Sequence, residues 1–94
     1  MSFPSDIEGL SKAVAGILRE RRLAAGLTLT DVAQRAGLTR QMVGFVEKGT
    51  RIPSLHTFAR LAVGLGVSPA ALLQEAEAKA GFQNQRVIGT KDGG

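Results

Sequence analysis

Apolar residues recur three and four positions apart in five stretches of the chain, separated by short polar or glycine-containing segments. This spacing places the apolar side chains on one face of a helix. The pattern predicts helices at about residues 10–25, 29–36, 40–48, 55–65 and 69–79. Short connections between helices favour a compact bundle with mostly local contacts. We therefore expect an all-α domain.

Polar residues and glycines mark the ends of the second and third predicted helices. Thr28 and Asp31 have the spacing of a capping box, in which each side chain satisfies a backbone amide at the helix start. Gly37 stands where a helix ends in a left-handed residue, and Thr39 is placed to cap the next helix. Gly49 lies just past the end of that helix. Such a helix-turn-helix unit is the shape that places its second helix in the major groove of DNA.

The 94 residues form one domain with an extension at either end. We assign residues 1–9 to an N-terminal arm, 10–79 to the helical domain and 80–94 to a C-terminal tail. Phe82, Val87 and Ile88 of the tail either pair as a strand with the tail of a second subunit or belong to a disordered segment. The other candidate dimer contact is the outward face of the fifth helix, formed by some of Ala71, Leu72, Glu75 and Ala78.

Basic residues concentrate in the helical domain. Between Lys12 and Arg60 the chain has nine basic and three acidic residues, a local charge of +6 compared with +4 for the whole chain. This surplus either keeps the surface solvated or binds a polyanion. Arg19 and Arg21 are expected to be exposed.

Composition narrows the classes of protein further. There is no cysteine, which excludes disulfides and thiolate metal sites and fits a reducing compartment. The sequence contains no run of about 18 apolar residues, so we expect no membrane span. The first residues lack a basic start followed by an apolar run, so we expect no secretion signal and a cytoplasmic location.

Several of these positions together match the pattern of a known family. They are GLT at 26–28, DVA at 31–33, AGLTR at 36–40, VEKG at 46–49, Arg51 and Pro53-Ser54. In these residues the chain resembles the lambda-repressor-like helix-turn-helix proteins, of the Cro/repressor or xenobiotic-response-element type. The resemblance implies a compact five-helix domain with a short C-terminal extension, double-stranded DNA as the ligand, and an ion pair between Arg22 and Glu47 that locks the first helix to the third.

The third helix is the predicted recognition helix. The resemblance places Arg40, Gln41 and Phe45 at positions that touch base edges. An arginine can fork onto guanine O6 and N7, a glutamine can bridge adenine N6 and N7, and a phenyl ring can pack on a thymine methyl group. Phe45 has the alternative of a core or dimer-contact role. Gly44, which weakens a helix by about 1 kcal/mol relative to alanine, indicates either a close approach at this point or mere drift.

Contacts with the DNA backbone are predicted at helix ends. Thr28 and Thr39 offer amides and hydroxyls at helix N-termini, where anions bind. Lys48 and Arg51 follow the recognition helix and bring positive charge close to the phosphates. The alternatives are that the threonines serve only as caps and the cations only as solvated charges. The family commonly has glutamine where this chain has Leu29, which puts one phosphate contact in doubt.

No constellation of catalytic residues is recognisable. The single histidine, His56, has no second ligand or nucleophile beside it, and Ser54 and Ser68 are explained as helix caps. We therefore expect neither an enzyme nor a metal or cofactor site.

The sequence predicts a sequence-specific DNA-binding transcriptional regulator. We expect a homodimeric repressor that binds an inverted-repeat operator and is associated with the nucleoid. One alternative is an antitoxin or restriction-modification controller that also binds a protein partner. The other is an adaptor that uses the same fold to bind proteins and does not bind DNA.

Overall fold

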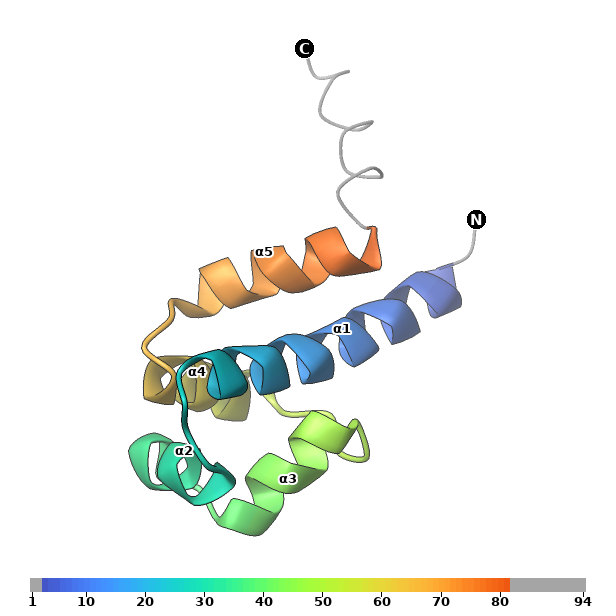
Figure 1. Cartoon of the computed structure of the whole chain (residues 1–94). Coiled ribbons are helices and arrows are strands. Elements are labelled where there is room, and N and C mark those ends of the chain that lie inside the picture. Colours follow the sequence, from blue (N-terminus) through green and yellow to red (C-terminus); the bar gives the residue numbers. More distant parts are fainter. Residues whose placement is uncertain (1–2, 82–94) are drawn as a thin grey trace.

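The chain folds into five helices, and the computed structural model describes residues 3–81 (Figure 1). The helices are α1 (Phe3–Ala24), α2 (Leu29–Ala36), α3 (Arg40–Lys48), α4 (Leu55–Gly64) and α5 (Pro69–Ala80). Over this range there is no strand, so the predicted all-α class is confirmed. The bounds of α2 and α3 agree with those predicted from the sequence.

α1 is longer than the apolar spacing predicts. It begins at Phe3 and not at about Leu10, so residues 3–9, which we assigned to an N-terminal arm, are helical. Pro4 lies in the first turn, where a missing amide costs little because the first amides of a helix have no intrahelical acceptor. Apolar spacing misses this turn because Ile7 is 59% exposed and so makes no inward stripe.

The turn between α2 and α3 is fixed by local hydrogen bonds. Thr28 Oγ1 accepts from the Asp31 amide at 3.0 Å, and the Thr28 amide donates to the Asp31 carboxylate at 2.9 Å, which completes the capping box. Thr39 Oγ1 accepts from the Met42 amide at 3.1 Å and caps α3. Gly37 ends α2 with φ of 71°, a conformation that favours glycine and lets the chain reverse within one short turn.

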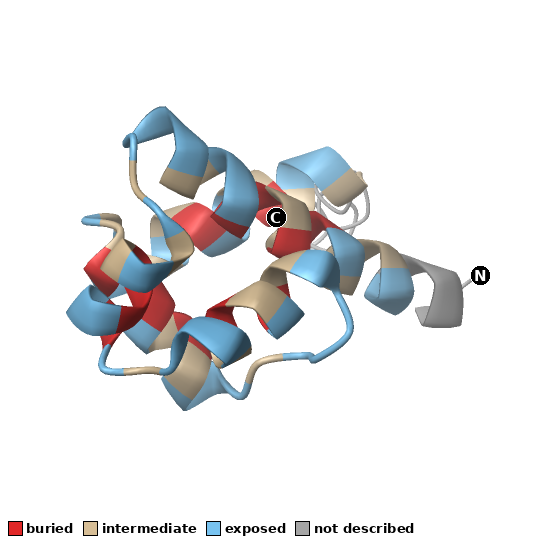
Figure 2. Ribbon diagram, turned by 60° about the horizontal axis from the view of Figure 1, so that its bottom comes forward, coloured by how far each residue is buried: buried red, intermediate tan, exposed pale blue. Residues whose placement is uncertain are grey.

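The core lies where all five helices meet. The most deeply buried large side chains come from α2, α3, α4 and α5, and each is at most 2% exposed: Val32, Val43, Val46, Leu61 and Leu72. Ile17 and Leu18 complete the core from α1. Figure 2 shows the buried positions turned toward the interior of the bundle. No polar or charged residue is buried within the described part of the chain, so the core is entirely apolar.

α1 lies between α5 and α3 (Figure 1). α2 packs against both α3 and α4, and α5 packs mainly along α1. The helix-turn-helix unit therefore occupies one end of the molecule, and α5 lies on the other side of α1 from it.

Ion pairs attach α5 to α1. Arg21 Nε donates to Glu75 at 3.1 Å, and Lys79 Nζ donates to Glu20 at 2.6 Å. The hydrogen bonds from Arg21 lower the pKa of the Glu75 carboxyl. Arg21 was expected to be simply exposed; its side chain is 42% exposed and paired. A short apolar stripe cannot reveal such a pair, because it joins residues 54 positions apart.

Part of the predicted dimer seam on α5 is occupied inside the protein. Leu72 is 1% exposed and belongs to the core, and Glu75 is held by α1. Ala78 remains exposed. The tail residues Phe82, Val87 and Ile88 lie outside the described residues. Within residues 3–81 no single helix is long and apolar enough to be a candidate membrane span. Taken together, α4 and α5 have the required length and hydropathy, but the two helices meet at a bend of 103°.

Candidate nucleic-acid interface

α3 presents one face to the core and another to the outside. Val43 and Val46 are each 1% exposed and anchor the inner face. The side chains on the outer face are exposed, and they include four that were predicted to contact DNA: Arg40, Gln41, Phe45 and Lys48. The N-terminal end of α3, with Arg40 and Gln41, projects from the bundle next to the turn that follows α2 (Figure 1). The inner face of α3 is thus packed against the core, and its outer face is accessible to a ligand.

An ion pair between Arg22 and Glu47 joins α1 to α3. Arg22 Nε donates to Glu47 at 2.8 Å and a second guanidinium nitrogen donates at 3.0 Å, so the contact is bidentate. The third guanidinium nitrogen donates to the Leu27 carbonyl at 2.9 Å. The two side chains are only 11% and 7% exposed. The hydrogen bonds to Glu47 raise the pKa of Arg22, so the guanidinium stays charged and holds the orientation of α3.

Phe45 points away from the core. Its side chain lies on the outer face of α3 with the residue 37% exposed, so the alternative of a core residue is wrong. The guanidinium carbon of Arg51 lies 5.9 Å from the centre of the ring. This distance is within the range of a cation–π interaction, which holds an arginine beside the apolar ring.

Thr50 is a residue that sequence reasoning did not identify. Its amide and its hydroxyl both donate to the carbonyl of Phe45, at 3.0 and 3.1 Å. The amide of Arg51 donates to the same carbonyl at 3.3 Å. These bonds fold the chain back over the end of α3 and place Arg51 next to Phe45. The only signal in the sequence is a threonine after the glycine that ends the helix.

Gly44 has open space beside it. A methyl group at this position would meet only Leu29 Cδ1, at 4.0 Å, which is an ordinary van der Waals distance. A close approach inside the protein therefore does not explain the glycine. Leu29, which stands where the family commonly has glutamine, packs against the core and lies beside α3 as an apolar support.

The two threonines have defined structural roles. Both act as helix caps, and both are exposed at the N-termini of α2 and α3. Thr28 also helps to lower the pKa of Asp31, mainly through the hydrogen bond from its backbone amide to the carboxylate. The helix N-termini that they cap have amides directed outward, the arrangement that accepts an anion.

Arg40, Lys48 and Arg51 are exposed cations around the outer face of α3. Among the described residues, the ion pairs involve other side chains, and none of these three has a carboxylate oxygen within 4.0 Å. The acidic residue of α3, Glu47, is neutralised by Arg22 on the inner side. The outer face consequently carries uncompensated positive charge.

The single histidine and the acidic residues were also considered as ligands for a metal ion. His56 is exposed on α4 and shares a shallow hollow with Arg35 and Arg60. In the part of the chain that the structure describes, no three His, Cys, Asp or Glu side chains are grouped so that they could hold a metal ion.

Comparison with known proteins identifies the family. Residues 18–72, which include α2, α3 and α4, match the helix-turn-helix family HTH_3. The chain belongs to the helix-turn-helix family of the Cro/C1 (XRE) type. This helix-turn-helix protein is accordingly a DNA-binding transcriptional regulator.

Relatives of this helix-turn-helix protein include two uncharacterised regulators. One, from Methanothermobacter thermautotrophicus, is an HTH-type transcriptional regulator that is 44% identical over 50 residues, or 53% of this chain and 72% of the relative. The other, an HTH-type transcriptional regulator from Sinorhizobium fredii, is 34% identical over 64 residues, or 68% of this chain and 83% of the relative.

Two solved structures are also similar. The restriction-modification controller protein C.AhdI from Aeromonas hydrophila is 41% identical, with a TM-score of 0.62 over 67% of this chain and 94% of that one. The clp gene regulator ClgR from Corynebacterium glutamicum is 26% identical, with a TM-score of 0.71 over 87% of each chain. The five-helix arrangement is thus shared with known regulators.

Proposed function

We propose that this regulator is a homodimeric repressor that reads an inverted-repeat operator with the outer face of α3. The observation that carries the proposal is the division of α3 into two faces. Its inner face is fixed by Val43, Val46 and the Arg22–Glu47 pair, whereas its outer face is exposed and positively charged. A rigid helix with an open polar face suits the major groove, which is wide enough to admit it.

The proposed base contacts come from the first turns of α3. Arg40 would donate two hydrogen bonds to a guanine, and Gln41 would bridge an adenine, because these pairings match donors to acceptors in the major groove. Phe45 would pack on a thymine methyl group, since its ring is exposed and offers no hydrogen bond. Gly44 would leave room for the DNA beside that ring, because a methyl group at this position would meet only Leu29 Cδ1 of the neighbouring helix, at 4.0 Å.

The proposed backbone contacts surround these side chains. Thr28 and Thr39 are exposed at helix N-termini and would present amides and hydroxyls to phosphates. Lys48 and Arg51, which lack carboxylate partners among the described residues, would add charge at the other end of α3. Such contacts set the position of the protein on the duplex but do not select its sequence.

Homodimer formation would supply the symmetry. Two copies related by a two-fold axis present two α3 helices to half-sites about 34 Å apart, one helical turn, so the operator would be an inverted repeat. Bound across a promoter, such a dimer would block transcription. With DNA as its ligand, the protein would be located in the cytoplasm with the nucleoid.

Selection from a random duplex library tests the proposal. The purified protein is mixed with the library at about 150 mM salt, at which non-specific phosphate binding is weakened, and the retained duplexes are sequenced. We expect enrichment of one inverted repeat with half-sites one helical turn apart. A folded protein that enriches no sequence would contradict the proposal and favour the adaptor alternative.

A second candidate function is that of a restriction-modification controller. The observation in its favour is the 41% identity to the controller C.AhdI over 67% of this chain. DNA reading would be the same, and the difference would lie in the genes controlled. A restriction or toxin gene adjacent to this one would favour the controller or antitoxin function, and its absence would favour a regulator of other genes.

A further inference from the structure

Two arginines on neighbouring helices border one hollow in the surface. The hollow, which we call the α2–α4 hollow, has a volume of about 440 Å³ and lies where α2 packs against α4. Four polar side chains line it, and all are exposed: Gln34, Arg35, His56 and Arg60. Two of them carry a full positive charge, and none carries a negative one.

The two guanidinium groups have no carboxylate partner in the described part of the chain. Among residues 3–81, no carboxylate oxygen lies within 4.0 Å of Arg35 or Arg60. α4 contains no acidic residue, and the carboxylate of Asp31 on α2 accepts a hydrogen bond from the Thr28 amide at 2.9 Å. That hydrogen bond is the main cause of the lowered pKa of Asp31, and the charge of Arg35 contributes least to it. The hollow therefore carries uncompensated positive charge.

Two glycines bring the arginines to the same hollow. Gly64 lets α4 approach α2 closely, since a methyl group there would lie 3.2 Å from the Ala36 nitrogen and 3.4 Å from the Cβ of Arg35. At Gly37 a methyl group would lie 3.0 Å from Nη2 of Arg60, so this guanidinium lies beside the backbone of the turn that follows α2. Like charges that border one hollow repel each other, so an anion between them would be stabilised.

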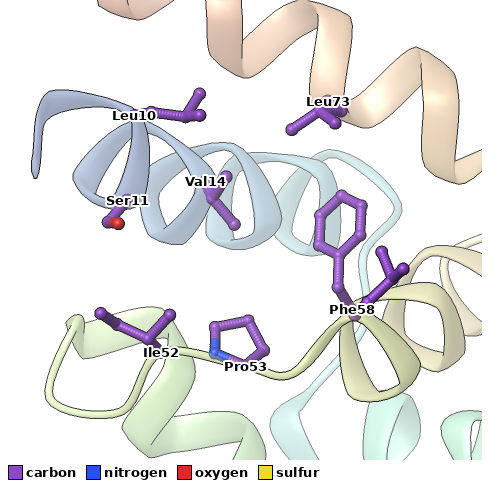
Figure 3. A pocket seen from close by; sticks show the side chains of 8 residues that line it. Leu10, Ser11, Val14, Ile52, Pro53, Phe58 and Leu73 are labelled. Carbon is purple, nitrogen blue, oxygen red and sulfur yellow. The ribbon is translucent and has the colours of Figure 1, made fainter. Parts of the chain in front are cut away.

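Two other hollows differ in character. The groove between α1 and α4 has no charged side chain in its lining, and Figure 3 shows Leu10 and Phe58 among the side chains around it. The hollow between α1 and the loop after α3 has Glu8 together with Lys12 and Arg51, so its charges are mixed. Cations without an acidic neighbour thus distinguish the α2–α4 hollow from both.

We propose that the α2–α4 hollow binds phosphates of the DNA duplex that flank the bases read by α3. The inference rests on the proposed function and extends it, because it adds a second contact with the same ligand. Neither Arg35 nor Arg60 belongs to the contacts expected from the sequence. Arginine suits this ligand, since its planar guanidinium can donate two parallel hydrogen bonds to one phosphate.

The hollow continues the proposed interface around the turn between α2 and α3. Gly37 lines the hollow and lies two residues before Thr39, which caps α3 and is a proposed phosphate contact. Residues 37–39 carry no charge, so no acidic group separates Arg40 from the hollow along the chain. A duplex has one phosphate charge per about 1.7 Å of its axis and runs on past the bases that α3 contacts. This continuity favours phosphates over the carboxylates of a protein partner as the bound anions.

Binding to a short and a long duplex tests the inference. The short duplex ends at the enriched inverted repeat, and the long one has about one further helical turn of unrelated sequence at each end. Arg35→Ala/Arg60→Ala removes both cations, and Arg35→Lys/Arg60→Lys keeps their charge. Lys79→Ala is the matched control, because it removes a charge from α5, on the other side of α1 (Figure 1). All these side chains are exposed and the ion pair of Lys79 is a surface pair, so the variants should fold, which circular dichroism checks.

The readout is the ratio of the two Kd values as salt is raised. We expect the wild type to bind the long duplex at least about tenfold more tightly at about 50 mM salt, and this advantage to fall with salt, because each phosphate contact adds about 0.9 to the slope of log Kd against log salt. The double alanine variant should lose the advantage and keep its affinity for the short duplex. The double lysine variant should keep most of the advantage, and Lys79→Ala all of it.

Two results would overturn the proposal. One is a wild-type advantage in a folded double alanine variant. The other is a wild type that binds the two duplexes equally, the result expected if the hollow binds carboxylates of a protein partner.

The measurement separates this inference from the proposed function. Specific binding of the short duplex, with no effect of the two arginines on the long one, would support operator reading and refute the flanking contact. In a protein that enriches no sequence, a salt slope on an arbitrary duplex that falls by about two in the double alanine variant, and is unchanged in Lys79→Ala, would do the reverse.

Discussion

Replacing Glu47 by alanine should remove the ion pair that joins α3 to α1 and destabilise the protein. Glu47 accepts two hydrogen bonds from Arg22, at 2.8 and 3.0 Å, and both side chains are nearly buried, at 7% and 11% exposed. In Glu47→Ala the guanidinium of Arg22 would keep one protein acceptor, the Leu27 carbonyl at 2.9 Å. A charge would then remain in a poorly solvated place without its counter-ion.

The size of the effect follows from that burial. Breaking a fully buried ion pair by removing one partner costs about 3–5 kcal/mol. Arg22 is not fully buried and has a flexible stem, so we expect a loss of about 2–3 kcal/mol. For a domain of this size that corresponds to a fall in Tm of roughly 10–20 °C. DNA affinity should fall as well, because α3 loses its fixed orientation.

A double variant separates the net contribution of the ion pair from the cost of leaving Arg22 without its counter-ion. In Arg22→Met/Glu47→Leu no unpaired charge remains, so its stability should lie within about 1 kcal/mol of the wild type. Urea denaturation of the wild type, Arg22→Met, Glu47→Leu and the double variant gives the free energies of unfolding and the coupling between the two sites, and Glu47→Ala is measured beside them. The reasoning is refuted if Glu47→Ala loses less than about 0.5 kcal/mol, or if the double variant is no more stable than Glu47→Ala.

Four further substitutions test other parts of the account. Arg40→Ala should weaken specific binding by about 1–3 kcal/mol and relax the preference at one base pair; an equal loss on every duplex would remove it from the base-reading set. Lys48→Ala should weaken binding to all sequences alike and reduce the slope of log Kd against log salt by about one, and an unchanged slope would exclude a phosphate contact. Gly64→Ala should lower the free energy of unfolding by about 1–2 kcal/mol, because the new methyl group would lie 3.2 Å from the backbone nitrogen of Ala36, and a more stable protein would show that the helices can separate at no cost. Asp31→Asn should be less stable than the wild type at neutral pH, with the difference vanishing in acid: the folded pKa of Asp31 is lowered, so its contribution is present above the unfolded value of about 4 and is lost as pH falls through the folded value. Melting curves between about pH 7 and 2.5 measure it, and a pH-independent difference would contradict the assignment.

Local signals in the sequence predicted the helix-turn-helix unit well. The capping box of Thr28 and Asp31 and the left-handed Gly37 depend only on residues close together in the chain, so composition and spacing suffice to find them. The apolar spacing indicated a buried face on α3 for the same reason, whereas the roles of its outward residues came from the family resemblance. The pair of Arg22 and Glu47, 25 residues apart, came from the family resemblance and not from spacing.

Features that depend on distant residues were missed or left open. The extension of α1 to Phe3 was missed because Ile7 is exposed and leaves the apolar stripe short. The contact of Arg21 with Glu75 joins two helices whose relative position a sequence pattern does not contain. The outward orientation of Phe45 required the structure, because a phenyl ring is equally suited to a core.

The most direct test of the central claim is a specificity ratio. The Kd of the wild-type protein is measured at about 150 mM salt for the duplex that it enriches and for a scrambled duplex of the same composition. If α3 reads base edges, the enriched duplex should bind at least about 1,000-fold more tightly. A ratio near one, with a folded protein and a normal salt dependence, would mean that the positive face of α3 recognises phosphates alone and does not read sequence.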